Sequence, residues 1–510
     1  MDWTTGYVVD LGYTYGYYTE LKPQQMRLAL LSAGLAVPEV KTACELGFGQ
    51  GMSANIHAAS STTQWWGTDF NPAQAAFAQE LARISGADAH LYDQAFAEFC
   101  TRTDLPDFDY IGLHGIWSWI SDENRQVIVD FIRRKLKVGG VLYISYNTMP
   151  GWAAMVPMRH LLTEHAEVMA APGRGTIARI DAAIEFAEKL LATKPLYARA
   201  HPQVAERLKK IKEQNRHYLA HEYFNRDWHP MPFADMANWL ASAKLNYACS
   251  AHYIDHVDGV NLTPDQQAFL KEIPDAMFRE TVRDFMVNQQ FRRDYWVRGA
   301  RRLNALEQLE ALRKQRVMLT LDRSQVTLKA SGSLGEAKLQ EPVYGPVLDA
   351  LADHQVKTLG QVEEQVRSRK IALPQVLQVM MVLTGNTVVQ AVQDEAQAKK
   401  AKATADRLNA NLLDRARGAG DISYLASPMT GGGFGVSRFG QLFLLARSQG
   451  RKQAQEWAEF AWRTISTQGH RLMKDGKPME KAEDNVAELS RQATEFAEKR
   501  LPVLKALGIA

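Results

Sequence analysis

Three glycines and an acidic residue in one short segment have the types and spacing that could bind a ligand. The segment Glu45-Leu46-Gly47-Phe48-Gly49-Gln50-Gly51 follows a short apolar run and precedes a helix-like one. Glycine adopts positive φ readily and lets a ligand approach the backbone, and free N–H groups at a helix start attract anionic groups. Glu45 ends a predicted strand, which is where open α/β sheets bind ligands.

Two further acidic residues follow the next predicted strands. Asp69 comes 22 residues after Gly47 and could accept hydrogen bonds from both hydroxyls of a ribose. Asp93 follows the third strand and could receive an adenine amino group. Asp69 could instead cap the following helix, although Asn71 is equally suited to that role. Taken together with the glycines, the two acids predict a nucleoside-type ligand.

Alternating strand-like and helix-like segments would position these residues. The predicted strands cover residues 42–46, 64–70, 87–92, 108–114 and 141–146, and the predicted helices cover 24–33, 52–59, 71–84 and 123–136. Such alternation requires right-handed crossovers and predicts an α/β fold with a doubly wound parallel sheet.

The rest of the chain divides into further predicted parts. The expected divisions are a ligand-binding domain over 1–150, a helical domain over 151–315, a small α+β module over 316–400, and a mostly helical domain over 401–510. The small module could be winged-helix-like. Residues 316–330 alternate with period two and predict a hairpin, and residues 393–412 predict a solvated helix or a linker.

Composition excludes several classes of protein. The 510 residues include 60 basic and 57 acidic side chains, a net charge of +3, which argues against a nucleic-acid scaffold or a binder of anionic membranes. Three cysteines are too few and too scattered for a disulfide framework or a thiolate metal site. Neither a signal-peptide pattern nor an apolar run of membrane-spanning length occurs, so we expect a cytoplasmic protein.

Aromatic residues gather in two places. The first 24 residues include Tyr7, Tyr13 and Tyr18, either as a segment packed on the core or as a lid over a ligand. Several more follow the fourth and fifth predicted strands: Trp117, Trp119, Tyr146 and Trp152. These rings could form the wall of a site for a cationic group, or they could be core.

Two motifs carry a resemblance to a known family. Glu45 to Gly51 resembles the first motif, and Gly67-Thr68-Asp69-Phe70-Asn71 the second, of class I S-adenosylmethionine-dependent methyltransferases. The resemblance implies a seven-stranded Rossmann-like domain with S-adenosylmethionine as its cofactor. It assigns the methionine part to Glu45, Gly47, Gly49 and Gly51, the ribose to Asp69, and the adenine to Phe70, Asp93 and Phe96. Phe48 is also a cofactor-binding candidate, although many members of the family carry a small residue or Cys there.

A second likeness extends over roughly residues 10–300. The segments 108–119, 146–152 and 218–225, with Asp284-Phe285 and Phe291-Arg292, are similar to methyltransferases that carry a methyltransferase regulatory domain, including rickettsial protein lysine methyltransferases. This likeness implies a regulatory or dimerisation-type domain over 151–315, a protein lysine as methyl acceptor and a possible homodimer. The acceptor could also be a small molecule or a glycan, or the protein could bind the nucleoside without catalysis.

The resemblance also implies site residues beyond the cofactor. Candidate catalytic residues are His114, Tyr146 and Asn147, without assigned roles, and candidate acceptor-binding residues are Tyr13, Tyr18, Trp117, Trp119 and Trp152. Adjacent residues on a helix point in different directions, so His221 and Glu222 do not predict a metal pair. We expect no metal, and we expect Glu222 at a domain interface, paired with Arg292 or Arg293.

Overall fold

A mixed seven-stranded sheet forms the centre of the protein. The computed structural model describes residues 7–9, 11–169, 173–474 and 476–510, so the start of the chain, where no leader pattern was found, lies outside the described residues. The strands run in the order β3-β2-β1-β4-β5-β7-β6. Their bounds are β1 Thr42–Leu46, β2 Gln64–Thr68, β3 Ala89–Tyr92, β4 Phe108–Leu113, β5 Leu136–Asn147, β6 Leu245–Ser250 and β7 Phe291–Arg298.

The first five strands are parallel, as the alternating pattern predicts. β1 pairs in parallel with β2 and β4, β2 with β3, and β4 with β5, whereas β7 is antiparallel to both of its neighbours. Helix α1 Pro23–Ser32 precedes β1, and the helices between the parallel strands are α2 Met52–Ser60, α3 Pro72–Ser85, α4 Phe96–Phe99 and α5 Asp122–Lys135. Asn71 caps α3 by accepting the N–H groups of Ala73 and Gln74, which leaves Asp69 available for another role.

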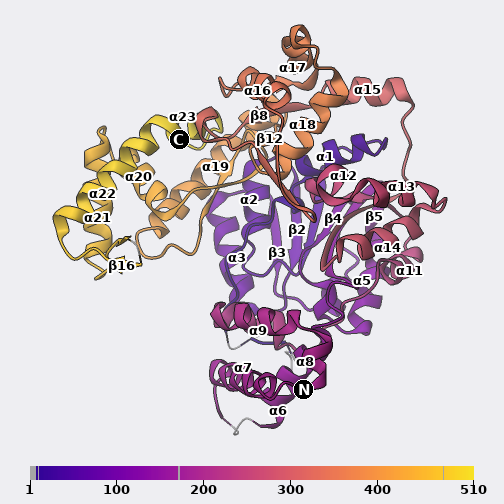
Figure 1. Ribbon diagram of the computed structural model, residues 1–510. Helices are drawn as coiled ribbons and strands as arrows, with labels where there is room; N and C mark the ends of the chain where they lie inside the picture. Colours follow the sequence, from indigo (N-terminus) through magenta and orange to yellow (C-terminus); the bar gives the residue numbers. More distant parts are fainter. Residues whose placement is uncertain (1–6, 10, 170–172, 475) are drawn as a thin grey trace.

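The segment after residue 150 contributes both helices and strands. Its helices are α6 Val156–Val168, α7 Thr176–Ala192, α8 Leu196–Ala200, α9 Gln203–Glu213, α10 Arg216–Tyr223, α11 Phe233–Ala241, α12 Asp258–Asn261, α13 Pro264–Glu272, α14 Ala276–Val287 and α15 Ala305–Arg313. Helices α6–α9 gather at one end of the sheet (Figure 1). Because β6 and β7 complete the central sheet, the division expected at residue 150 cuts through a single structural unit.

A buried guanidinium fixes β7 in this sheet. Arg292 of β7 donates to Asp284 of α14 at 2.6 Å, to Glu280 at 2.9 Å and to Asp294 at 3.0 Å. Tyr146 of β5 donates its hydroxyl to Asp294 at 2.9 Å. Arg292, Asp284 and Asp294 are each at most 5% exposed, so the cation and the acids compensate one another away from water.

The small module differs from the hairpin predicted over 316–330. β8 Arg316–Leu319 is the middle strand of a sheet with β11 Lys357–Thr358 and β12 Val389–Ala391, while β9 Lys329–Gly332 pairs with β10 Gly335–Lys338. The helices are α16 Glu341–Ala350, α17 Leu359–Val366 and α18 Leu373–Gly385. The hairpin prediction is wrong because the buried residues of β8 pair with distant strands rather than with the next strand in sequence. The winged-helix-like module stays a prediction.

The C-terminal part packs against the central sheet's helices. Its elements are α19 Glu395–Arg415, β13 Tyr424–Ser427, β14 Gly432–Gly435, α20 Arg438–Ser448, α21 Ala454–Ser466, β15 Met473–Lys474, β16 Lys477–Pro478, α22 Ala482–Glu495 and α23 Leu501–Ala506. The predicted helix at 393–412 exists as α19, but it is not solvated on all sides. Its Ala401, Ala405 and Leu408 are buried, and the helix packs on α2 and α3. The boundary expected at residue 400 falls inside this helix.

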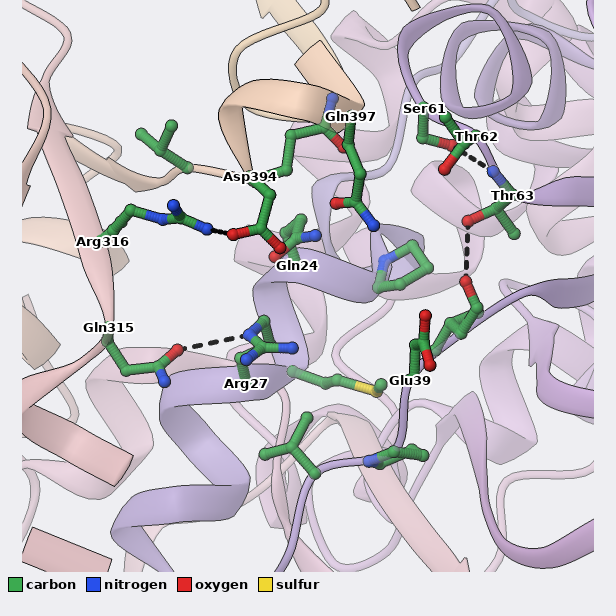
Figure 2. A pocket seen from close by; sticks show the side chains of 18 of the residues that line it. Gln24, Arg27, Glu39, Ser61, Thr62, Thr63, Gln315, Arg316, Asp394 and Gln397 are labelled. Atoms are coloured by element: carbon green, nitrogen blue, oxygen red, sulfur yellow. Dashed lines mark hydrogen bonds and ion pairs between the residues drawn. The ribbon is translucent and has the colours of Figure 1, made fainter. Parts of the chain in front are cut away.

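A polar cavity of about 340 Å³ lies where these parts meet, at the amino-terminal edge of the sheet (Figure 2). Its lining residues come from α1, from the segments before β1 and β2, from β8 and from the start of α19. Arg27 of α1 donates to Gln315 at 3.3 Å, and Arg316 forms an ion pair with Asp394. The later parts of the chain are thus anchored at the edge opposite the glycine turn.

None of the described helices is both long and apolar enough to cross a bilayer.

We predict that Arg292→Ala destabilises the protein by about 3–5 kcal/mol, because it leaves buried carboxylates uncompensated. Urea denaturation followed by tryptophan fluorescence measures the change. Arg301→Ala is the matched control, since Arg301 pairs with Glu307 at the surface, with 63% and 45% of the two side chains exposed, and should cost no more than about 0.5 kcal/mol. Equal stability of the Arg292→Ala variant and the wild type would contradict the prediction.

Candidate active site

A cavity of about 430 Å³ lies at the carboxyl ends of β1, β2 and β4. It brings together most of the residues predicted from the motifs, which are Glu45, Gly47, Phe48, Gly49, Asp69, Phe70, Phe96, His114, Tyr13, Tyr18 and Trp119. Further lining residues come from α10 and the loop after it, notably His221, Glu222 and Asn225. The carboxyl edge of a parallel sheet is where such folds bind ligands, so this cavity is the candidate site.

The glycine turn has the backbone geometry that its sequence predicts. Gly47, Gly49 and Gly51 have φ values of 72°, 57° and 69°, in the left-handed region that favours glycine. A Cβ at Gly47 would lie 2.4 Å from Ile116, and a Cβ at Gly51 would lie 2.4 Å from Ala78. Gly51 does not line the cavity. Because Gly51 has no Cβ, the start of α2 can pack closely against Ala78 of α3.

Asp69 holds the turn in place. Its Oδ2 accepts the N–H of Gly49 at 2.9 Å, and its Oδ1 accepts the N–H of Asn71 at 3.0 Å. Burial raises the pKa of Asp69 to about 6, and the two backbone N–H groups oppose that rise. The side chain therefore links the ends of β1 and β2 while it faces the cavity.

Glu45 is a buried acid with an unused acceptor. The residue is 3% exposed, and its Oε2 has no hydrogen-bond partner among the described residues. Burial, and then the charge of Asp69, raises the pKa of Glu45 to about 8. A cationic or hydrogen-bond-donating ligand group would satisfy this carboxylate.

The region next to β3 differs in one respect from the prediction. Phe70, Gln94 and the 95–97 segment line the cavity, but Asp93 is exposed and does not. Asp93 thus lies outside the cavity lining, and its expected contact with an adenine amino group stays a prediction. The chain turns at Asp93 into solvent, and Gln94 and Phe96 are the residues that face inward.

The N-terminal segment covers the cavity and is packed at the same time. Tyr18 stacks on His114 with ring centroids 3.7 Å apart, and Tyr13 contacts His221 edge-on at 5.0 Å. Tyr7 lies between Phe70 and His221, at 5.6 and 5.5 Å. The segment thus packs against the core, as in the first interpretation, and lies over the cavity, as in the second.

His114 is a cavity residue held in its neutral form. Its Nδ1 lies 2.8 Å from the hydroxyl of Tyr143. Burial, and then the charge of Arg293, lowers the pKa of His114 to about 3. The ring therefore contributes an uncharged aromatic surface beneath Tyr18, and among the described residues the hydrogen-bond partner of its Nδ1 is a phenol and not an acid.

Most of the predicted aromatic wall is core instead. Trp119 lines the cavity and donates its Nε1–H to the carbonyl of Glu222 at 3.2 Å. Trp117 is fully buried, and Trp152 donates to the side chain of Asn147 at 3.1 Å. These two tryptophans, with Tyr146 and Asn147, do not line the cavity, so their expected placement there is wrong.

The alternation of side chains along β5 explains the placement of Tyr146. Tyr143 and Ser145 point to the side of His114 and Gly115, with which they make hydrogen bonds. Tyr146 points to the opposite face and reaches Asp294. A residue at the end of a strand can thus face the site only if it lies on the same face of the strand as the other residues that line the site.

Glu222 also departs from its expected position. It does not pair with Arg292 or Arg293, because Arg292 binds three other acids and Arg293 lies 3.4 Å from Glu20. Glu222 instead accepts a hydrogen bond from Tyr13 in the cavity wall, at 3.3 Å. The 218–225 motif signalled this segment, but no local pattern showed which side chain would face the ligand.

Within the described residues, no three or more His, Cys, Asp or Glu side chains are grouped so that they could hold a metal ion.

We predict that Glu45→Gln stabilises the protein, and more so at pH 8 than at pH 5. The folded protein raises the pKa of Glu45 from 4.5 to about 8, so it loses stability as the pH rises between these values. The Gln variant avoids that loss and should gain on the order of 1–3 kcal/mol above pH 8. Urea denaturation at pH 5 and 8 tests this.

Asp107→Asn is the control, since Asp107 is 62% exposed at the other edge of the sheet. A Glu45→Gln gain that does not depend on pH would contradict the prediction.

Comparison with known proteins places the chain in a family. Residues 215–298 match a family model described as a predicted methyltransferase regulatory domain. The uncharacterized protein sll1526 of Synechocystis is 40% identical over the full length of both chains, and the uncharacterized protein RP789 of Rickettsia prowazekii is 29% identical over 54% of this chain and 49% of its own.

Among solved structures, PKMT2 from Rickettsia typhi in complex with AdoHcy matches with a TM-score of 0.68 at 16% identity, over 95% of this chain and 98% of its own, which establishes the shared fold. These matches show that the chain belongs to the same family as sll1526, that residues 215–298 match the predicted methyltransferase regulatory domain, and that the seven-stranded sheet has the fold of class I S-adenosylmethionine-dependent methyltransferases.

Proposed function

We propose that this protein binds S-adenosylmethionine and transfers its methyl group to an amine, the side chain of a protein lysine. The observation that carries the proposal is the placement of Glu45 and Asp69 on either side of the glycine turn in one cavity. When bound, S-adenosylmethionine supplies an electrophilic methyl group on a positively charged sulfur.

The residues present fit that ligand. The unpartnered Oε2 of Glu45 suits the ammonium group of the methionine part, and Asp69 suits ribose hydroxyls. Gly47 and Gly49 allow close approach to the backbone, while Phe70 and Phe96 offer apolar surface for a base. The likeness to PKMT2, a structure that holds AdoHcy, supports the same ligand class.

The protein contributes positioning and shielding from water. Transfer requires the acceptor nitrogen, the methyl carbon and the sulfur to lie in line, and fixed alignment supplies much of the rate. Tyr7, Tyr13 and Tyr18 cover the cavity, which limits access of water to the reacting atoms. A lysine side chain is narrow enough to enter a covered cavity while its backbone stays outside.

The cover also favours a second candidate. Because Tyr13 and Tyr18 lie over the cavity, a small amine could be the acceptor instead of a protein. A protein that binds the nucleoside without catalysis would keep the same cofactor residues.

We predict that Asp69→Asn weakens binding of S-adenosylmethionine about 10- to 100-fold, as expected for loss of hydrogen bonds to a charged group. Asparagine keeps an acceptor for the N–H of Gly49, so the turn should persist. Isothermal titration calorimetry measures the affinity, with Asp107→Asn as the control that should bind like the wild type. Absence of binding to the wild type, or equal affinity of wild type and Asp69→Asn, would refute the cofactor assignment.

Incubation of the protein with cell lysate and S-adenosylmethionine carrying a labelled methyl group tests the acceptor. We expect label on protein, mapped by mass spectrometry to lysine. Label only among small molecules would support the second candidate, and no label despite cofactor binding would support the non-catalytic alternative.

A further inference from the structure

The wall of the cavity opposite the glycine turn contains an acid that the cofactor does not require. Glu222 lies on α10, more than 170 residues after the turn in sequence, within the matched regulatory-domain segment 215–298. It shares the cavity with Glu45 and Asp69. Tyr18 lies between the two walls, and the charges of both Glu222 and Glu45 raise its pKa.

The surroundings of Glu222 provide phenols, and the cation in the same cavity wall, Arg226, pairs with Asp227 at 3.1 Å rather than with Glu222. Tyr13 donates its hydroxyl to Glu222 Oε1 at 3.3 Å. The negative charge of Glu222 also raises the pKa of four other tyrosines, namely Tyr7, Tyr18, Tyr218 and Tyr223. In the part of the chain that the structure describes, no lysine, arginine or histidine forms an ion pair with this carboxylate.

Glu222 is partly buried, and a partly buried carboxylate without a counter-charge is unfavourable unless a ligand supplies the cation. The other buried acids outside the cavity follow this rule, since Asp284 and Asp294 both pair with Arg292. Glu222 instead faces a space that a ligand can enter. The missing partner is therefore a cationic group that arrives from the cavity.

We propose that Glu222 binds the ammonium group of the methyl acceptor and accepts its proton, with Tyr13 orienting the carboxylate. This inference rests on the proposed transfer to an amine. It assigns acceptor binding to the regulatory-domain segment, so that one wall of the cavity holds the cofactor and the other holds the substrate.

The chemistry balances in two steps. A proton passes from the acceptor ammonium to the carboxylate of Glu222, which leaves a neutral amine and a carboxylic acid. The nitrogen lone pair then forms a bond to the methyl carbon while the carbon–sulfur bond breaks, and its electron pair stays on sulfur. The product is a methylated ammonium and a neutral thioether, and the proton on Glu222 leaves to solvent with product release.

The electrostatics of the wall suit this role. Burial raises the pKa of Glu222 to about 7, and the hydrogen bond from Tyr13 opposes that rise. A proton acceptor is most effective when its pKa is close to the working pH. The titratable groups that face Glu222 are Tyr7, Tyr13 and Tyr18 from the N-terminal segment and Tyr218, His221 and Tyr223 from α10.

Two analogues of S-adenosylmethionine test the inference by binding alone. In both analogues a nitrogen atom replaces the sulfur, and an arm on that nitrogen replaces the methyl group. The arm is 4-aminobutyl in one analogue and pentyl, of equal length but without the amine, in the other. We expect the amine to strengthen binding to the wild type about 10-fold or more, as for a hydrogen-bonded charge pair, and to give no gain with Glu222→Gln. Glu272→Gln, an exposed acid of the same segment, should keep the gain.

The outcomes separate the inference from the proposed function. An equal gain in wild type and Glu222→Gln, or no gain in the wild type, overturns the role of Glu222 while cofactor binding stands. Failure of the wild type to bind S-adenosylmethionine overturns the proposed function, and the inference fails with it. Unchanged binding of the pentyl analogue to Glu222→Gln shows that this variant is folded.

The pH dependence of lysate labelling gives an independent readout. Wild-type transfer should rise with pH through about 7 as Glu222 ionises, and Glu222→Gln should lose about 100-fold in rate together with that rise. Tyr13→Phe removes a hydrogen bond that lowers the pKa of Glu222, so the transfer rate of this variant should rise at a higher pH than that of the wild type. An unchanged pH profile in Glu222→Gln would overturn the proposed role.

Discussion

Carboxylates removed from water around one cavity are the constraint on which the site depends. Glu45, Asp69 and Glu222 all have raised pKa values, and burial is the largest cause for each. Asp69 is stabilised by backbone N–H groups and Glu222 by a phenol, but neither interaction supplies a positive charge. Folding therefore pre-forms a site whose carboxylates cationic or hydrogen-bond-donating ligand groups can satisfy.

Segments distant in sequence must meet to form the cavity that contains these three carboxylates. β1 and β2 bring Glu45 and Asp69 to one edge, the 7–18 segment covers them, and α10 closes the far wall. Hydrogen bonds hold these segments in place. The backbone N–H of Tyr18 donates to Ser53 of α2, and the ring of His221 on α10 contacts the carbonyl of Leu11. The cavity thus depends on tertiary contacts that form only when the sheet is complete.

The sequence predicted those features of the site that are local. The glycine turn, Asp69 and the strand ends follow from spacing, backbone sterics and the topology of parallel sheets. The placement of Tyr146 depends on side-chain alternation along β5, and that of Trp152 on its packing against Tyr223 and Trp228, which no local pattern encodes. Glu222 was expected to pair with Arg292 or Arg293 at an interface. Long-range packing decides which charges pair, and here it places three other acids around Arg292.

The same reasoning applies to the wider fold. Helix α19 was predicted from composition, but its buried face is determined by its contact with α2 and α3. β8 looked like half of a hairpin because period-two alternation reports burial on one face and not the identity of the partner strand. Element types were therefore readable from the sequence, whereas partners were not.

The regulatory-domain segment is structurally inseparable from the central sheet. Residues 215–298 provide β6, β7 and the cavity-lining helix α10, so they complete both the sheet and the site. A detachable regulator would bury a separate core, but Trp296 of β7 lies in the same hydrophobic cluster as Ile111 of β4. Any change that alters this segment must therefore act on the sheet and on the cavity wall formed by α10 together.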